Sequence, residues 1–300
     1  MAALPDGKVI RGSVIGYGGA FNMGKHHADQ IRAAGMAVTF LDVGQGLSVV
    51  IRLPSGRAVL YDAGPAFAGG AVVAPFLKSA GVGRLAAAVL SHTDSDHAGG
   101  MAVVMQHVPA DTILFTGHGI RNNARFAELR GVPRRNSSMA FRLAYRGVEL
   151  AGEPGVRLVF LHPPRGWFRR TSKASAADEN SAVLAIEYGN TAALLTGDLE
   201  TRGERMLSDH LGGLPSIRLL QVPHHGSQSS SSPGFLAALD PGYAVVSAGR
   251  GNRFGHPRPV VVARYRRAGV RFLETALDGA VIAVSDGRDW SIQPPPGKSK

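Results

Sequence analysis

Short apolar runs separated by glycine-containing turns fill the chain from residue 37 onward, and they predict a protein rich in strands. Two strands are expected within residues 38–52, around a glycine-rich turn, and a third within 58–64. Short strands joined by glycine turns are typical of an antiparallel meander. We therefore expect the main domain to begin with such a meander.

Further along the chain, segments that we expect to be helices alternate with strands, and this alternation favours the α/β class. Helices are expected at 72–80 and 99–107, on either side of a buried strand at 85–90, and residues 111–175 show the least regular pattern. A strand at 111–115 is still expected there. The later pattern predicts strands at 181–188, 191–198, 217–222 and 243–247, helices at 201–211 and 260–268, and two closing strands.

The two ends of the chain differ from this pattern. Residues 1–36 read as a strand, a glycine turn and a helix, and they resemble the first β-α unit of the Gfo/Idh/MocA oxidoreductases. Phe21 stands where the dinucleotide-binding fingerprint needs its third glycine. We therefore expect a truncated extension that binds no nicotinamide cofactor. The main domain is expected at 37–293, followed by a disordered proline-rich tail at 294–300.

Composition narrows the possible chemistry. The 300 residues include no cysteine, so histidine, aspartate and water must hold any metal. A signal peptide and an apolar run of about 20 residues are not evident, so we expect a cytoplasmic protein without a membrane partner. The net charge of +11 suits an anionic partner, although arginine in an Ala/Gly-rich chain can also reflect genome composition.

Residues 92–100 carry the densest group of potential metal ligands. His92, Asp94, Asp96 and His97 follow the strand at 85–90 within six residues. A loop at a strand end lets such side chains converge, and two imidazoles with two carboxylates suit a pair of divalent ions. The alternative is a polar turn whose aspartates cap a helix beginning near Ala98.

Further acids and histidines also follow predicted strands. Asp62 ends one strand, Asp198 another, and the pair His224 and His225 a third, while His256 lies in a later loop. Because each lies just past a strand end, all can project to one edge of the packed sheets.

Basic and aromatic residues are interleaved in the segment 163–173. Its candidates for nucleic-acid contact are Arg165, Trp167, Arg169 and Arg170, joined by Asn252 and Arg253 from a later loop. Cations beside aromatic rings can hold phosphates and stack a base. The alternative is a solvated loop whose aromatics pack on the domain.

Seven motifs in this order resemble the metallo-β-lactamase superfamily. They are Leu41-Asp-Val-Gly-Gln-Gly, Tyr61-Asp-Ala-Gly, His92-Thr-Asp-Ser-Asp-His, Asn180-Ser181, Leu195-Thr-Gly-Asp, His224-His-Gly-Ser and Asn252-Arg-Phe-Gly-His-Pro. The chain is similar in particular to the soluble hydrolase domain of ComEC-type DNA-uptake competence proteins. The resemblance implies an αββα four-layer sandwich, in which helices flank two mixed sheets, with a dinuclear metal site at one sheet edge.

The resemblance also implies roles for these residues. His92 and Asp94 would bind a first metal, Asp96 and His97 a second, and Asp198 would bridge them. His225 is favoured over His224 as the last ligand, which leaves His224 as a phosphate contact. Asp62 would orient the metal loop with support from Asn180 and Ser227. Asp96, His224 and His256 are the candidate catalytic residues, with His256 binding phosphate or donating a proton to the leaving group.

Two departures from the common superfamily pattern concern the first metal. Asp94 stands where many members carry histidine, and Asn180-Ser181 replaces the usual histidine of the third motif. Both agree with the ComEC-type subgroup. They make the site rich in oxygen, which shifts its preference from Zn²⁺ toward Mn²⁺ or Mg²⁺.

The expected function is metal-dependent hydrolysis of a phosphodiester, with DNA as the first substrate and a hydroxide shared by two ions as the nucleophile. One alternative is a hydrolase of the same fold that acts on a lactone, thioester or phosphocholine ester, because fold does not decide substrate. Another is a nucleic-acid-binding module without catalysis. The sequence leaves the oligomeric state open.

Overall fold

Two β-sheets stacked face to face form the centre of the molecule. The computed structural model describes residues 35–120, 123–132, 139–167 and 175–293. Within them, one sheet has eight strands, in the order β15-β14-β1-β2-β3-β4-β5-β6, and the other has seven, in the order β13-β12-β11-β10-β9-β8-β7. The strands of the first sheet are β1 (Met36–Phe40), β2 (Val49–Arg52), β3 (Ala58–Tyr61), β4 (Ala87–Leu90), β5 (Thr112–Phe115), β6 (Ala140–Leu143), β14 (Val281–Ser285) and β15 (Trp290–Gln293). Those of the second are β7 (Glu149–Glu153), β8 (Val156–His162), β9 (Val183–Tyr188), β10 (Thr191–Leu195), β11 (Ser216–Gln221), β12 (Tyr243–Val246) and β13 (Arg271–Glu274).

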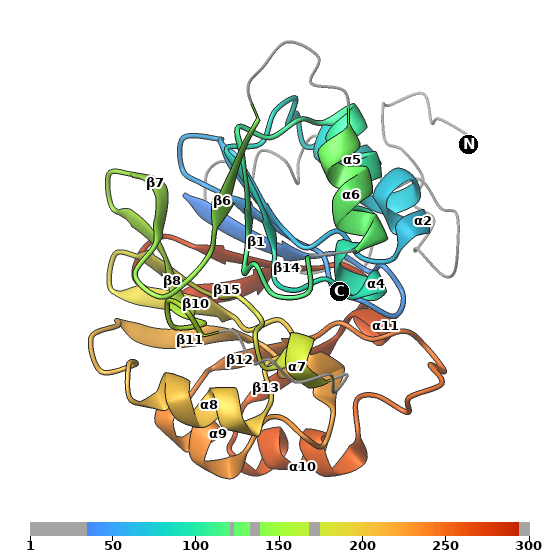
Figure 1. Ribbon diagram of the computed structural model, residues 1–300. Coiled ribbons are helices and arrows are strands. Elements are labelled where there is room, and N and C mark those ends of the chain that lie inside the picture. The colour runs from blue at the N-terminus through green and yellow to red at the C-terminus, as the bar shows by residue number, and fades with distance from the viewer. Residues whose placement is uncertain (1–34, 121–122, 133–138, 168–174, 294–300) are drawn as a thin grey trace, which may run out of the picture.

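Helices cover the outer face of each sheet. On the first sheet lie α2 (Ala66–Ala68), the π-helix η1 (Gly69–Val73), α3 (Ala74–Ser79), α4 (Ser95–Ala98), α5 (Met101–His107) and α6 (Ala124–Gly131). On the second lie α8 (Thr201–Ser208), α9 (Pro233–Leu239) and α10 (Pro259–Arg267). The short elements α7 (Ser175–Asp178), η2 (Pro223–Gly226) and α11 (Thr275–Asp278) connect strands. Figure 1 shows the two helical layers above and below the sheets, which confirms the predicted αββα sandwich.

Strand residues alternate between two apolar cores, which explains why these strands read as continuous apolar runs. In β9, Leu184 and Ile186 face the core between the sheets, whereas Val183 and Ala185 face α8 to α10. The same alternation in β1 sends Val38 inward. Both sheets are thus buried on both faces along their central strands.

Parallel strand pairs in both sheets end at the same edge of the sandwich. Strands β3 to β6 are parallel in the first sheet, and β10 to β13 in the second. The loops after these strands therefore meet, and they carry the predicted ligands. The opening strands β1 to β3 are antiparallel, which confirms the predicted meander.

The structure corrects several expected elements. Residues 111–175 contain the expected strand as β5, and in addition three strands that the sequence pattern does not predict, β6 to β8, and the helix α6. The helix expected at 99–107 is α5, which begins at Met101, and the short helix α4 precedes it within the metal loop. The helix expected at 72–80 begins at Ala66 instead. A third late strand, β13, precedes the two closing strands. The segments 1–34 and 294–300 lie outside the described residues, so both remain predictions.

Glycines permit the close packing beneath the metal loop. A Cβ on Gly100 would lie 2.3 Å from the backbone oxygen of Ala63, and one on Gly69 would lie 2.3 Å from the oxygen of Gly100. These contacts let the loop after β4 lie against the loop after β3. In the described part of the chain, every helix is too short or too polar to traverse a lipid bilayer.

Candidate metal centre

Asp62 joins the loop after β3 to the metal loop after β4. Its carboxylate, which is fully buried, accepts hydrogen bonds from the Ser91 backbone nitrogen (2.8 Å) and from Ser91 Oγ (2.6 Å). It also lies 2.8 Å from His97 Nδ1. A carboxylate in this position fixes both the orientation and the tautomer of the ring. Because Nδ1 is engaged by Asp62, His97 presents Nε2 to the centre, and this nitrogen offers a lone pair to a metal once its proton is displaced.

His225 is oriented in the same way from the second sheet. Its Nδ1 donates to the backbone oxygen of Ser247 (2.7 Å), so its Nε2 also carries a lone pair. The Nε2 atoms of His97 and His225 lie 3.0 Å apart. Without a metal, a proton can join these nitrogens, because burial is outweighed by Asp198 and Asp62, which raise the pKa of His97 well above its ordinary value. A divalent ion can take the place of that proton. This donor pair therefore fits a divalent metal.

Asp96 belongs to the same group as these two histidines. One ligand atom from each of Asp96, His97 and His225 lies within 4.8 Å of the others, and Asp96 Oδ2 is 3.4 Å from His225 Nε2. Burial would raise the pKa of Asp96, but the His225 ring outweighs it and lowers that pKa. The structure thus brings together three of the ligands expected for the second metal.

Asp198 lies between the predicted metal positions. Its Oδ1 is 3.1 Å from His97 Nε2, and its Oδ2 is 3.5 Å from His225 Nε2. One ligand atom each of Asp198, His92 and His97 also forms a group within 4.8 Å. The surrounding histidines overcome burial and lower the pKa of Asp198 well below its ordinary value. Asp198 thus lies within reach of His92 on one side and of His97 and His225 on the other, as a bridging role requires.

His92 presents a nitrogen that no described residue satisfies. Its side chain is buried, and Nδ1 lies 2.9 Å from Ser91 Oγ. Among the described residues, Nε2 has no hydrogen-bond partner. Burial, with His97 nearby, lowers the pKa of His92 and favours the neutral ring. A neutral, buried imidazole with a free lone pair fits a metal ligand.

Two further acids of the centre, Asp178 and Glu200, were not predicted from the sequence. Asp178 lies at the end of α7, and one ligand atom each of Asp178, His92 and Asp94 forms a group within 4.8 Å. Glu200 forms another such group with Asp178 and His224. Burial, with Asp198 nearby, raises the pKa of Asp178 to about 7. Glu200 immediately precedes the predicted helix α8, and this position was a signal in the sequence, whereas Asp178 ends the four-residue helix α7, which the sequence pattern does not predict.

His224 and His256 lie at the rim of the centre. His224 Nε2 is 3.7 Å from Asp198 Oδ2, and its Nδ1 is 3.4 Å from Glu200 Oε1. Burial opposes protonation, but Asp198 and Glu200 raise the pKa of His224 to about 9. The ring centroids of His224 and His256 are 5.9 Å apart. Burial, together with His224, lowers the pKa of His256 to about 4.

The residues expected to support the ligands differ in their contacts. Asn180 is fully buried in the turn before β9, where its backbone nitrogen donates to the oxygen of Ala177 (3.0 Å). Ser181, next to it, lies 3.1 Å from the Asp198 backbone nitrogen through its hydroxyl. Ser227 Oγ is 2.8 Å from Ser229 Oγ and thus belongs to the loop after η2.

Among the residues expected to contact nucleic acid, four are described. The guanidinium of Arg165 lies 5.5 Å from the Tyr145 ring centroid, and that of Arg253 lies 4.8 Å from the Phe254 ring. Arg202 covers the Trp167 ring at 5.1 Å. Arg169 and Arg170 lie outside the described residues.

The Asn252 side chain stabilises its own loop, residues 249–256. Its amide donates to the backbone oxygens of Gly249 (2.8 Å) and His256 (2.5 Å), and its Oδ1 accepts from the nitrogens of Phe254 and His256 (3.1 Å each). Both ends of the side chain are therefore used to hold the loop, and it has no group left for a nucleotide.

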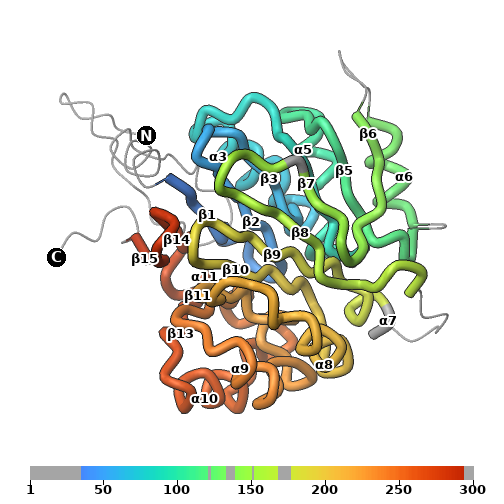
Figure 2. The backbone as a smooth tube through the Cα atoms, turned by 90° about the vertical axis from the view of Figure 1, so that its left-hand side faces the viewer, coloured from blue at the N-terminus to red at the C-terminus, as the bar shows by residue number. Residues whose placement is uncertain are grey.

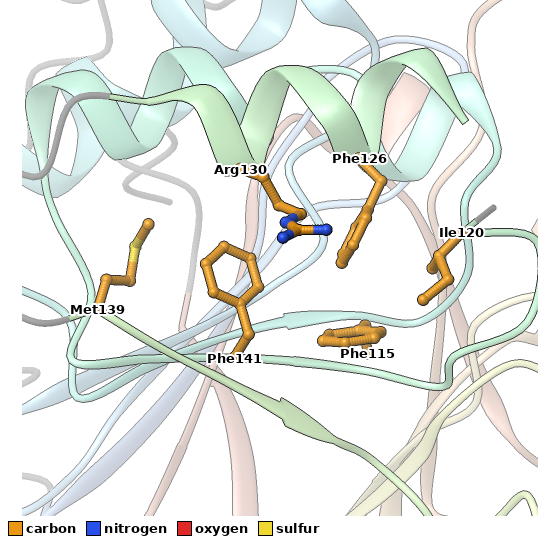
Figure 3. Close-up of a pocket in the computed structure, with 6 residues that line it drawn as sticks. All are labelled: Phe115, Ile120, Phe126, Arg130, Met139 and Phe141. Carbon is orange, nitrogen blue, oxygen red and sulfur yellow. The ribbon is translucent and has the colours of Figure 1, made fainter. Parts of the chain in front are cut away.

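A cavity of about 450 Å³ lies apart from this chemistry, between α6 and the strands β5 and β6. Figure 3 shows Arg130 above a floor of aromatic rings, with Ile120 at one end and Met139 at the other. The six lining residues include neither a carboxylate nor an imidazole: Phe115, Ile120, Phe126, Arg130, Met139 and Phe141. This cavity is thus not a hydrolytic site.

Imidazoles and carboxylates gathered at the edge of an αββα sandwich define the chain as a protein of the metallo-hydrolase fold. The Metallo-beta-lactamase superfamily profile matches residues 41–165. The chain thus contains a metallo-β-lactamase superfamily domain, and the relatives that it matches include competence proteins. It is 38% identical to the competence protein ComA of Neisseria gonorrhoeae over 82% of this chain and 32% of that protein. It is 28% identical to ComE operon protein 3 of Bacillus subtilis, over 86% and 34% of the two chains.

The chain thus spans about a third of the length of the curated relatives it matches. Among solved structures, it is similar to Igni18, a metallo hydrolase from Ignicoccus hospitalis, with a TM-score of 0.52 and 14% identity over 86% of this chain and 98% of that one. At this identity the likeness concerns the fold alone.

His162 anchors the turn that carries Asp178, and it predicts a dependence of stability on pH. Its Nε2 lies 2.9 Å from the backbone oxygen of Glu179, and burial lowers the pKa of His162 to about 4 from an ordinary 6.5. The unfolded chain therefore binds more protons between these values, so the free energy of unfolding falls as the pH decreases through this window. The His162 contribution reaches about 3 kcal/mol.

Urea unfolding of metal-free protein between pH 7 and pH 4 measures this effect. We expect His162→Gln to have a shallower pH dependence than the wild type, whereas His210→Gln, at an exposed position, retains the wild-type slope. Equal slopes for the wild type and His162→Gln would rule out this contribution.

Proposed function

We propose that the chain is a metal-dependent phosphodiesterase that hydrolyses DNA. The observation that carries this proposal is the pair of facing Nε2 atoms of His97 and His225, surrounded by the carboxylates of Asp96 and Asp198. When bound there, two divalent ions supply Lewis-acid polarisation of a phosphate and lower the pKa of water. Asp96, His97, His225 and Asp198 would hold one ion, and His92, Asp94 and Asp198 the other.

A groove beside the centre supports an extended anionic substrate. It has a volume of about 500 Å³ and is lined by Thr116, Arg142, Leu143, Tyr145, Val148, Pro163, Pro164, Arg165 and Gly166. Thr116 follows β5, whose last residue pairs with Leu90 at the start of the metal loop. Pro163 follows His162, which contacts Glu179. The groove is thus built on loops from both sheets, and these loops follow residues that pair with the strand before the metal loop or contact the turn that carries Asp178.

The chemistry of the groove fits a nucleotide chain. Arg142 and Arg165 supply positive charge for phosphates, and Tyr145 and the exposed Leu143 supply apolar surface for a base. The net charge of +11 adds long-range attraction for a polyanion. The competence proteins that the chain resembles are consistent with DNA, although the chain covers only part of them.

The two rim histidines take different roles in this proposal. Burial opposes protonation, but Asp198 and Glu200 raise the pKa of His224 to about 9 in the metal-free chain, so we assign His224 to attracting phosphate and holding a proton for the leaving oxygen. With a pKa of about 4, His256 is neutral and contributes a hydrogen bond instead. Glu200 keeps the His224 ring in place through its Oε1 contact with Nδ1. We thus favour His224 as the proton donor.

The groove arginines provide a test of substrate class. We expect the double variant Arg142→Ala/Arg165→Ala to raise the KM for a labelled DNA strand about tenfold or more at 0.15 M salt, because phosphate contacts are lost. Its salt dependence should be shallower than that of the wild type. Hydrolysis of a small chromogenic phosphodiester should remain unchanged, because that substrate does not reach the groove.

The control for this experiment is Arg57→Ala, an exposed arginine that precedes β3 and lies at the opposite edge of the sheet. It removes charge outside the groove. If the control weakens DNA hydrolysis as much as the double variant does, the groove is not the binding path.

Metal preference is the second test. Carboxylate and water ligands favour hard ions, so we expect activity of metal-stripped protein to return better with Mn²⁺ than with Zn²⁺. Asp94→His should move the preference toward Zn²⁺. Turnover and occupancy are measured together, because Zn²⁺ often binds tightly without giving the best rate. A wild type that works best with Zn²⁺, and an unchanged ranking in Asp94→His, would contradict the argument.

A further inference from the structure

The first metal position has fewer ligands of its own than the second. The resemblance to the superfamily supplies His92 and Asp94, with Asp198 shared, while the usual third histidine is replaced by Asn180-Ser181. The structure brings Asp178 to this place. One ligand atom each of His92, Asp94 and Asp178 lies within 4.8 Å of the others, and Asp178 Oδ1 is 3.8 Å from His92 Nε2.

The unsatisfied Nε2 atom of His92 is independent evidence that an ion binds at the first metal position. The residue is only 3% exposed, and its Nε2 has no hydrogen-bond partner among the described residues. Its Nδ1 lies 2.9 Å from Ser91 Oγ, which in turn donates to Asp62, so the ring cannot turn without breaking this chain. The unsatisfied nitrogen is thus fixed toward the side on which Asp178 lies.

Hydrogen bonds hold the backbone at Asp178 and at the residue that follows it. Its carbonyl oxygen accepts from the Ser181 nitrogen (2.9 Å), and the next residue, Glu179, is tied by its own carbonyl to His162 (2.9 Å). The Glu179 carboxylate accepts from the Gly203 nitrogen in α8 (2.8 Å). Figure 2 shows α7 next to α8, in agreement with this contact. Asp178, which is 8% exposed, therefore has its backbone placed before any ion arrives.

We propose that Asp178 is a protein ligand of the first metal and takes the place of the missing histidine. The site then consists of one imidazole, from His92, and the carboxylates of Asp94, Asp178 and Asp198. Such a set favours a hard ion with six oxygen-rich ligands over tetrahedral zinc. The inference rests on the metal centre of the proposed function and not on its substrate.

The test measures Mn²⁺ binding to metal-stripped protein by calorimetry and by electron paramagnetic resonance. We expect the wild type to bind two Mn²⁺ per chain with a spin-coupled signal. In Asp178→Ala and Asp178→Asn, one ion should bind as in the wild type, the other at least about tenfold more weakly, and the coupled signal should disappear. Asp178→His should restore the second ion and strengthen Zn²⁺ binding there.

Asp111→Asn, at the opposite edge of the sheet, is the matched control and should bind two ions. If both Asp178 variants bind two Mn²⁺ with wild-type affinity and coupling, Asp178 is not a ligand, and its contact with the Glu200 and His224 group is only an ion pair. Asp178→Asn preserves the shape of the side chain, so it keeps the test valid if Asp178→Ala fails to fold. A wild type that binds two ions but leaves DNA intact would refute the proposed function and not this inference.

Discussion

Replacing Asp198 by alanine should abolish turnover and remove the binding of two metals. Its carboxylate lies within 3.1 to 3.7 Å of three imidazole nitrogens, those of His97, His225 and His224. Without it, neither group of ligands keeps its shared oxygen, and the buried histidines lose their counter-charge. We expect kcat/KM for DNA to fall by about 10³-fold or more. Metal content by mass spectrometry and single-turnover hydrolysis measure the two effects.

Asp209→Ala is the control for this prediction, because it removes an exposed aspartate at the end of α8. It should retain both metals and wild-type turnover. Two ions still bound per chain in Asp198→Ala would contradict the bridging role. Loss of turnover with full metal content would instead assign Asp198 to another step.

Asp62 should affect both stability and metal affinity, although it does not reach the metal position itself. Its buried carboxylate accepts from the Ser91 nitrogen and hydroxyl and faces His97 Nδ1. Asp62→Ala leaves these buried donors without a partner and places alanine at a φ of 57°. We expect the free energy of unfolding to fall by about 3 kcal/mol or more. Metal affinity should fall 10- to 100-fold, since an outer partner of a ligand is lost.

Asp62→Asn separates the charge from the shape, because asparagine also tolerates left-handed backbone and retains one acceptor oxygen. It should be less destabilised than Asp62→Ala and still bind metal more weakly than the wild type. The same substitution at Asp240, an exposed aspartate with a φ of 43°, should change neither property. Urea unfolding and Mn²⁺ calorimetry give these quantities. Wild-type metal affinity in both Asp62 variants would contradict the proposal that Asp62 orients the metal loop.

The order of ligands along the chain was predictable because each follows a strand. The apolar runs before Asp62, His92 and Asp198 mark the ends of strands, and parallel ends meet at one edge. The choice between His224 and His225 needed the structure. Only His225 donates its Nδ1 proton to a backbone oxygen while its Nε2 faces His97.

The remaining features have weak local signals. Strand β6 is exposed along most of its length, β7 contains glycine and two glutamates, and α7 has only four residues. Elements of this kind are stabilised by pairing with distant strands, which composition does not reveal. Asp178 was missed for that reason, since its place depends on His162 and Gly203. Strand β8 does have a local signal, because its residues from Leu158 to Leu161 are all apolar. This strand was nevertheless not predicted from the sequence.

Hydrolysis of DNA by the metal-loaded wild type tests the central claim most directly. A labelled single-stranded oligonucleotide is incubated with metal-stripped protein and Mn²⁺, Mg²⁺ or Zn²⁺ in turn, beside Asp198→Ala prepared in the same way. We predict cleavage that requires added ion, is strongest with Mn²⁺, stops with chelator and is absent in the variant. An intact oligonucleotide under all three ions, in protein shown to hold two metals per chain, would contradict the proposed function.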